Sequence, residues 1–131
     1  MPSHEIDPQG LPYALDKLPK KPDVGAAAYF NLDLRAGRVL EAGPFAGARK
    51  PSLKLKVDFG PLVGTLQTSA QITNYAPDEL VGRMVVGAIN LGPKKIAGFV
   101  SEFLILGALD PDGTVRLLQV EEGVEPGAPI A

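Results

Sequence analysis

The chain has 131 residues, 45% of them hydrophobic, and a formal net charge of −2 at pH 7, which suits one domain with an ordinary core. It contains no cysteine, so disulfides, thiolate catalysis and cysteine-ligated zinc are excluded. No apolar run approaches the ~20 residues of a membrane helix, and the first ten residues lack the basic start and apolar centre of a secretory signal, so we expect neither a secretory signal nor membrane insertion.

Residues 1–28 are expected to form a proline-rich N-terminal arm. They contain five prolines and lack sustained hydrophobic periodicity. Such a segment favours extended backbone, with at most one helical turn near residues 13–18. Residues 29–131 are expected to form the folded domain.

The domain begins with three predicted strands. Residues 34–42 form the first. Residues 53–59 alternate between apolar side chains and Lys54 or Lys56, which puts the two lysines on the solvent face of a second strand. Residues 63–72 form a third, which turns Leu66, Ala70 and Ile72 toward the core and leaves a polar row on its other face: Thr65, Gln67, Ser69 and Gln71.

A short helix and further strands follow. Pro77 and the acids after it begin a helix that Gly82 ends. Residues 84–90 and 99–106 are predicted strands, and a turn at residues 110–113 leads to another at 114–120. Three strands, a short helix and two strands follow the order of an OB-fold, an all-β, five-stranded Greek-key barrel, here with an additional C-terminal strand.

The second and third strands carry a candidate ligand face. Lys54 and Lys56 would have Cα atoms roughly 6.6 Å apart, near the spacing of phosphates along an RNA strand. The polar row of the third strand would lie beside them and could contact sugar and phosphate. A solvated strand face shows the same pattern, so an ordinary surface remains the alternative for the two lysines alone.

Two basic pairs lie in predicted loops. Arg49 and Lys50 precede the second strand, and Lys94 and Lys95 lie between Pro93 and Gly98, which are expected to hold a loop open. Loops around an OB barrel commonly carry ligand contacts, although basic loops also serve solubility. The scarcity of aromatic residues favours recognition of a folded RNA by shape and backbone.

Glu102 is unusual because it lies within an apolar run. A buried carboxylate is costly unless it is hydrogen-bonded, so Glu102 is expected to accept hydrogen bonds from the backbone of the 94–98 loop; the alternative is a bulge that faces water. Phe59 and Phe103 are expected in the core, whereas Phe45 and Phe99 lie near loops.

The residues argue against an enzyme. The one histidine, His4, lies in the arm, so no Ser/His/Asp set can form within the domain. No phosphate-binding loop or dinucleotide fingerprint occurs. Asp110 and Asp112 suit a turn, and a calcium site would need more ligands, so neither metal nor cofactor is expected.

Four segments resemble the CsaA family, which belongs to the tRNA-binding OB-fold group. They are DLRAGRVLEAGPF (33–45), LKVDFG (55–60), TSAQIT (68–73) and IAGFVSEFLILG (96–107). Related domains are appended to methionyl-tRNA synthetases and occur in the phenylalanyl-tRNA synthetase beta chain.

The resemblance implies a cytoplasmic, homodimeric OB-fold protein that binds tRNA without catalysis. It carries the family's basic loop onto Lys94 and Lys95, its Ser-Glu motif onto Ser101 and Glu102, and its strand-closing asparagine onto Asn90. Together with the reasoning from the strands, it gives the residues expected to contact RNA: Arg49, Lys50, Lys54, Lys56, Gln67, Ser69, Gln71, Asn90, Lys94, Lys95, Ser101 and Glu102.

Two alternatives remain open at this point. CsaA proteins are also described as chaperone-like and export-related, which implies binding of unfolded or precursor polypeptides; apolar loops around Phe45 and Phe99 would be the contacts. The other alternative is a dimerisation module with neither ligand.

Overall fold

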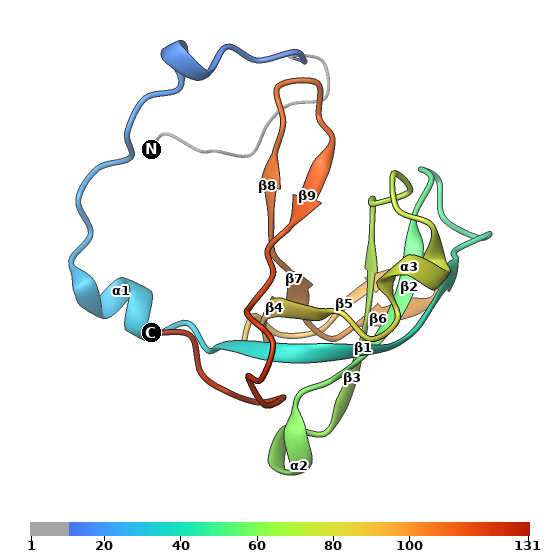
Figure 1. Cartoon of the computed structure of the whole chain (residues 1–131). Coiled ribbons are helices and arrows are strands. Elements are labelled where there is room, and N and C mark those ends of the chain that lie inside the picture. Colours follow the sequence, from blue (N-terminus) through green and yellow to red (C-terminus); the bar gives the residue numbers. More distant parts are fainter. Residues whose placement is uncertain (1–10) are drawn as a thin grey trace.

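Five antiparallel strands form the centre of the molecule, in the order β3–β2–β1–β4–β7 (Figure 1). They are β1 (Leu34–Pro44), β2 (Leu53–Asp58), β3 (Thr65–Ala70), β4 (Met84–Ala88) and β7 (Leu104–Ile105). Two hairpins are added to them: β5 (Lys94–Ile96) pairs with β6 (Phe99–Ser101), and β8 (Gly107–Leu109) pairs with β9 (Val115–Leu117). The computed structural model describes residues 11–131.

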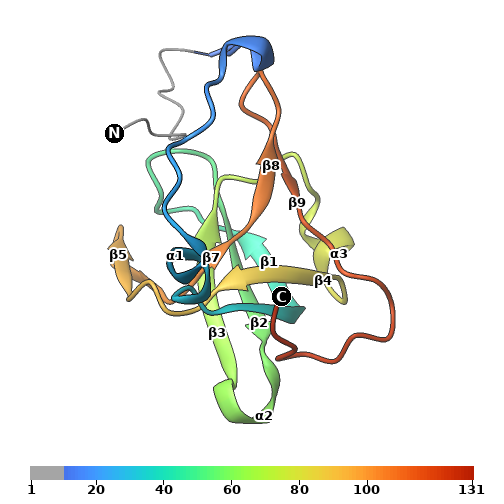
Figure 2. The same ribbon diagram turned by 90° about the vertical axis from the view of Figure 1, so that its left-hand side faces the viewer.

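The helical segments are short. They are η2 (Leu15–Lys17), α1 (Ala26–Phe30), α2 (Gly60–Val63) and α3 (Pro77–Leu80). Figure 2 shows α2 at one end of the molecule and the tip of the β8–β9 hairpin at the other. In the part of the chain that the structure describes, no helix is both long and apolar enough to span a membrane.

The barrel curves at β1, which changes its pairing partner along its length. Residues 34–38 of β1 pair with β4, and residues 38–44 pair with β2, with a register shift between Val39 and Glu41. A bulge of this kind bends and twists a strand. On the far side, the backbone N–H of Glu102 donates to the carbonyl oxygen of Gln67 on β3, at 2.8 Å. This bond nearly closes the barrel, and with α3 between β3 and β4 it confirms the predicted OB-type fold.

Two phenylalanines fill the centre of the core. The rings of Phe59 and Phe103 meet edge to face with centroids 4.9 Å apart, as expected for core residues. Gly37 and Gly87 leave room for them, since an added Cβ would lie 2.7 Å from Cε1 of Phe59 at Gly37 and 2.8 Å from its Cζ at Gly87. A side chain at either glycine would therefore displace the ring of Phe59.

Several predicted strand boundaries differ from those in the structure, and two of the differences have an identifiable cause. The third strand begins at Thr65 rather than residue 63, because residues 60–63 turn into α2 after the carboxylate of Asp58 accepts the N–H of Gly60 at 2.8 Å. The predicted fifth strand is broken after Ser101, since Glu102 bonds to β3 whereas Leu104 pairs with β4. The last strand is shorter than predicted.

The predicted loop at residues 94–98 is instead a hairpin. Lys94–Ile96 forms β5, and the chain reverses at Ala97 and Gly98, which have φ angles of 48° and 80°. Glycine adopts this left-handed conformation without strain. The two lysines are therefore presented from a paired strand.

The N-terminal arm contains the expected helical turn, η2. Sequence reasoning missed α1, where three alanines favour a helix, and the predicted division at residue 28 falls inside it. His4 and the rest of the first ten residues lie outside the described residues.

Candidate nucleic-acid interface

The exposed side of β2 carries Lys54 and Lys56, as the alternation of the strand predicts. On one flank, Lys54 lies opposite Gly43 and Lys56 beside Glu41 on β1. On the other flank, the same lysines lie opposite Ser69 and Gln67 on β3. The predicted polar row is thus adjacent to the two ammonium groups. We call Lys54, Lys56, Gln67 and Phe99, together with Lys94 and Lys95 of the β5–β6 hairpin that carries Phe99, the lysine face, and we treat it as a candidate surface.

Two aromatic rings hold the Lys54 side chain. Its Nζ lies 4.6 Å from the ring centroid of Phe45 and 4.9 Å from that of Phe99. The two rings meet edge to face, with centroids 5.4 Å apart. Phe45 is buried and Phe99 is half-buried, so Phe99 is the ring of this pair that a ligand can reach. Contact between an ammonium and an aromatic ring favours this position of the charge.

A groove runs along the lysine face. Its volume is about 290 Å³, and Phe99 lies at its wall together with Lys54, Lys56 and Gln67. We call it the stacking groove. It combines a partly exposed ring, two cations and a side-chain amide, which are the groups that hold an unpaired base and its phosphate.

The β5–β6 hairpin contributes Phe99 to the wall of this groove and carries Lys94 and Lys95 on its other strand. The side-chain amide of Gln67 donates from Nε2 to the carbonyl oxygen of Val100 at 2.9 Å, which ties β6 to β3. Lys94 pairs with Ser101, and Lys95 pairs with Val100. Both lysines are exposed, and neither forms an ion pair within residues 11–131.

Glu102 and Ser101 hold the hairpin in place. Glu102 was expected to accept hydrogen bonds from the 94–98 segment, and this was wrong: its Oε1 accepts the backbone N–H of Gln67 at 3.0 Å. The buried hydroxyls of Ser101 and Thr68 lie 2.9 Å apart, and that of Thr68 also donates to the carbonyl oxygen of Phe103 at 2.7 Å. The Ser-Glu motif therefore joins β3 to β6.

The other basic pair precedes β2 in the chain. Arg49 and Lys50 are exposed in the loop between β1 and β2. Lys50 also lines a second groove of about 470 Å³, with Ser69 and Gln71 from the predicted polar row. Most of this second groove, the apolar groove, is formed by aliphatic side chains: Leu11, Ile72, Ile96, Leu104, Ile105, Leu109 and Val115.

Asn90 lies apart from the lysine face. Its Oδ1 accepts the backbone N–H of Asp33 at 2.8 Å, and its Nδ2 donates to the carbonyl oxygen of Asn31 at 2.9 Å. These contacts lie before the first residue of β1, whereas Gly43, opposite Lys54, lies near the last. The amide of Asn90 fixes the entry into the barrel.

The lysine face is not purely basic. Lys56 Nζ lies 3.4 Å from a carboxylate oxygen of Glu41, and both side chains are more than half exposed. An exposed pair of this kind contributes ~0–1 kcal/mol, so an incoming phosphate can displace it. Sequence reasoning missed Glu41, and it missed the placement of Lys54 over the rings, because Phe45, Lys54 and Phe99 are far apart in the chain.

Comparison with known proteins supports a nucleic-acid role for this barrel. Residues 34–129 match the sequence profile of the family described as "Putative tRNA binding domain". The chain is 38% identical over 108 residues to a methionine–tRNA ligase of Porphyromonas gingivalis, and the alignment covers 82% of this chain and 16% of the ligase. The chain thus spans about a sixth of the length of that ligase.

Two solved structures resemble the whole domain. The CsaA chaperone protein from Picrophilus torridus is 43% identical with a TM-score of 0.78, and the match covers 83% of this chain and 100% of that one. Chaperone CsaA from Bacillus anthracis str. Ames is 40% identical with a TM-score of 0.79, and the match covers 84% of this chain and 100% of that one.

Fold and comparisons together define the class of protein, a tRNA-binding module built on an OB-type barrel. Within that class, the chain belongs to the tRNA-binding domain family as a CsaA-like member. The resemblance expected from the four sequence segments is confirmed.

Proposed function

We propose that this chain is a non-catalytic protein that binds structured tRNA through the lysine face, as a homodimer in the cytoplasm. Membership of the tRNA-binding domain family supports the ligand. A two-fold dimer would present two copies of one face to a single RNA, and linked contacts raise the overall affinity.

The chemistry of the face suits RNA backbone. Lys54, Lys56, Lys94 and Lys95 neutralise phosphates, and such contacts position the nucleic acid without reading its sequence. Gln67 uses its amide nitrogen on Val100, which leaves its side-chain oxygen to accept a 2′-hydroxyl. Phe99 stacks on an unpaired base at the wall of the stacking groove.

One observation carries this proposal: the ammonium of Lys54 lies over Phe45 and Phe99 beside Gln67 on the wall of a single groove. The contact surface extends past the N-terminal end of β2 and includes Arg49, Lys50, Ser69 and Gln71. We assign Asn90, Ser101 and Glu102 a positioning role, since their polar groups bond within the chain.

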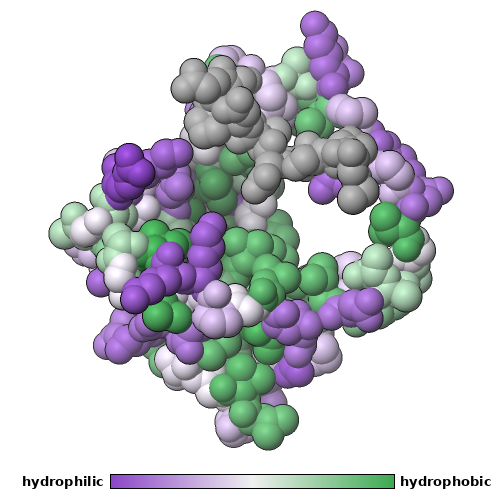
Figure 3. All heavy atoms as spheres, turned by 180° about the vertical axis from the view of Figure 1, so that it is seen from behind, coloured by the Kyte–Doolittle hydropathy of each residue, from purple (hydrophilic) through white to green (hydrophobic). Residues whose placement is uncertain are grey.

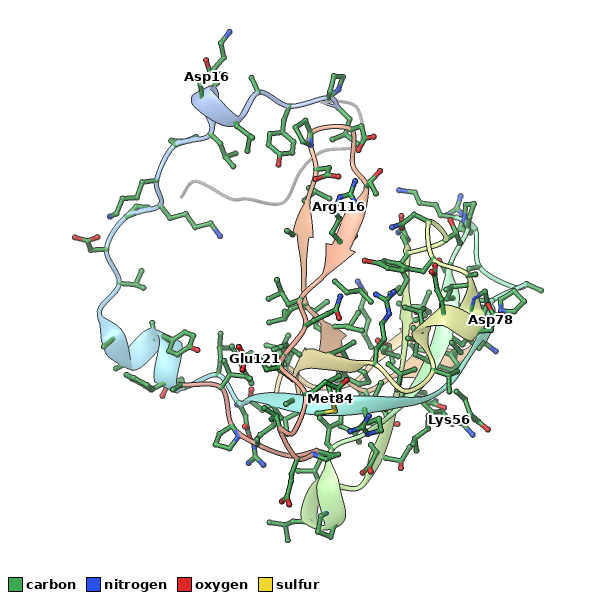
Figure 4. All side chains as sticks on the ribbon, in the orientation of Figure 1. Asp16, Lys56, Asp78, Met84, Arg116 and Glu121 are labelled. Atoms are coloured by element: carbon green, nitrogen blue, oxygen red, sulfur yellow. The ribbon has the colours of Figure 1, made fainter. Side chains whose placement is uncertain are left out.

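The test is a filter-binding titration of total tRNA against salt, with the wild type and the double variant Lys94→Ala/Lys95→Ala. Each phosphate contact contributes roughly 0.7–0.9 to the slope of log affinity against log salt, so the double variant should lose about 1.4–1.8. The control, Arg83→Ala/Arg116→Ala, also removes two cations. Arg116 lies on the β8–β9 hairpin (Figure 4). An equal loss of slope in both variants would contradict a specific role for β5.

A second function, polypeptide binding, is favoured by the apolar groove. Its aliphatic lining is suited to the side chains of an unfolded segment, and the two similar solved structures are named as chaperones. The apolar groove shares no lining residue with the stacking groove, but it includes Lys50, Ser69 and Gln71 of the extended RNA contact surface. Both ligands could bind at once only if RNA is held by the lysine face without these three residues.

Competition separates the two functions. Labelled tRNA is mixed with an excess of a permanently unfolded polypeptide, and the bound fraction of each is measured. Simultaneous binding indicates two sites, and mutual exclusion indicates one shared face. Failure to bind either ligand would leave a dimerisation module.

A further inference from the structure

The part of the N-terminal arm that the structure describes before α1, residues 11–25, is attached to the domain through Leu11 and Tyr13. The backbone N–H of Tyr13 donates to the carbonyl oxygen of Pro111 at 3.0 Å, and its hydroxyl donates to that of Leu109. Leu11 packs against Gly113, where an added Cβ would lie 2.7 Å from its Cδ1. The arm is therefore fixed to the tip of the β8–β9 hairpin.

The chain is fixed again at α1, which follows the arm, and immediately after it. The hydroxyl of Tyr29 donates to the carbonyl oxygen of Ala131 at 3.1 Å, and Asn90 holds the carbonyl of Asn31. Between these two attachments the arm stands away from the barrel. Every residue from 14 to 32 is exposed, and Figure 3 shows an opening through the molecule between this segment and the barrel.

Large apolar side chains lie along this segment. The exposed fractions are 66% for Leu15, 70% for Val24 and 72% for Phe30. Isolated exposed apolar residues are ordinary, but several on one stretch mark an interaction surface. Figure 3 shows hydrophobic atoms on both sides of the opening.

The charged residues around the opening indicate which kind of partner could bind there. Residues 14–32 carry three lysines and two aspartates, whereas residues 110–125 carry five acids and one arginine. Glu121 lies at the foot of the β8–β9 hairpin, at the edge of the space that the arm encloses in Figure 4. A polyanion such as RNA would be repelled by this acidic segment. Lys17 and Lys21, which form no ion pair within residues 11–131, could instead pair with the same acidic segment of a second copy.

We propose that the arm closes around a second copy of this chain, with Leu15 and Val24 against apolar surface of the partner and Lys17 and Lys21 facing acids of its 110–125 segment. This inference rests on the homodimer of the proposed function and names the segment that holds the dimer together. An extended arm loses conformational entropy when it is ordered, and burial of its apolar side chains on a partner offsets that loss. The arm precedes residues 34–129, which match the family profile.

The proposed closure of the arm around a partner, which we call the clasp, is tested with full-length variants. Sedimentation velocity at a series of protein concentrations gives the dimer dissociation constant of each variant. Leu15→Ser/Val24→Ser should raise the dimer dissociation constant at least tenfold, because both side chains are exposed in a single chain and buried only against a partner. The matched control is Leu62→Ser on α2, a residue that is 93% exposed at another end of the molecule (Figure 1); its dissociation constant should stay within twofold of the wild type. An unchanged constant in the arm variant would overturn the clasp and leave the dimer intact. A wild type that remains monomeric at every concentration would overturn both.

Cross-linking adds a direct readout. Chains with light and heavy nitrogen isotopes are mixed, equilibrated and coupled by carbodiimide, which joins a lysine to a nearby carboxylate. With equal amounts of the two chains, about half of the links between Lys17 or Lys21 and acids of residues 110–125 should join one light and one heavy peptide. Links confined to peptides of the same isotope would show that the arm closes on its own chain, contrary to the proposal.

Discussion

The lysine face and the N-terminal arm both present lysines, but the structure holds them by different means. Lys54 and Lys56 belong to a central strand, paired on both sides, and Lys54 is packed against two rings. Lys17 and Lys21 belong to a segment whose residues are all exposed. In Figure 4, Lys56 lies on the side of the barrel away from the arm. One set of charges is positioned before any ligand arrives, and the other needs a partner to position it.

The two regions also differ in the conformational entropy that they lose on binding. Side chains that are already held in place lose little, whereas ordering a loose segment at an interface lowers the net affinity. We therefore expect the barrel to respond to small changes inside one chain, and the arm to respond only when assembly is measured. Four predictions test the preformed side of this contrast, the barrel and the turn that holds the arm, from the largest effect to the smallest.

The barrel should not tolerate one added methyl at Gly37. The Cβ would lie 2.6 Å from Cγ1 of Val57, so Gly37→Ala should lower the free energy of unfolding by about 2–3 kcal/mol, as overpacked cores do. Urea unfolding measures this. Gly43→Ala, in the same strand but with no atom within 4 Å of its Cβ, is the matched control and should change stability by less than about 0.5 kcal/mol. Equal effects would show that the barrel core is loosely packed.

Phe99 should contribute to tRNA affinity through stacking. Loss of one base–aromatic stack costs about 1–3 kcal/mol, so Phe99→Ala should weaken tRNA binding by roughly 5-fold to 150-fold, whereas Phe99→Tyr should retain most of it. Filter binding at constant salt measures both variants. If Phe99→Ala left tRNA affinity intact but abolished polypeptide binding, the groove would belong to the second function.

Glu41 should oppose RNA binding. Its carboxylate pairs with Lys56 at 3.4 Å, so Glu41→Gln frees one cation and removes one negative charge near the phosphates. We expect a gain of about 0.5 kcal/mol, or twofold to threefold in tRNA affinity at low salt, which disappears as salt screens the charges. Asp78→Asn on α3 removes the same charge elsewhere (Figure 4) and should have less effect. A gain as large in the control would mean that only net charge matters.

The smallest effect concerns the turn to which the arm is attached. The backbone N–H of Thr114 donates to Asp112 Oδ1 at 2.9 Å and lowers the pKa of Asp112 below its ordinary value of 3.8. The folded turn therefore favours the ionised form. Its stabilisation is complete above the ordinary pKa and is lost as the pH falls through the lowered value. NMR titration of the Asp112 carboxyl should show this shift, and Asp112 titrating at its ordinary value would contradict the turn as described.

Local patterns allowed the regular parts of the barrel to be predicted. Alternation identified β2 and the side on which Lys54 and Lys56 lie, and Pro77 with the acids after it identified α3. These signals are carried by adjacent residues. They act before tertiary contacts form, so the sequence reveals them directly.

The parts that were missed depend on contacts between distant residues. Lys94 and Lys95 read as a loop because Pro93 and Gly98 flank them, and only pairing with β6 makes them a strand. Glu102 finds its partner on β3, 35 residues earlier in the chain. The stacking groove likewise joins Lys54 to Phe99 across the barrel. No local signal marks such contacts, although both Phe45 and Phe99 fall in the segments that resemble the CsaA family.

One measurement tests the central claim most directly, because it reads both regions in the same sample. Lysine acetylation by a water-soluble reagent is timed with and without saturating tRNA, and the rate at each lysine is followed by mass spectrometry. The account predicts that tRNA slows the reaction severalfold at Lys54, Lys56, Lys94 and Lys95 and leaves Lys17 and Lys21 unchanged. Protection of the arm lysines, with the lysines of the barrel as reactive as before, would contradict it.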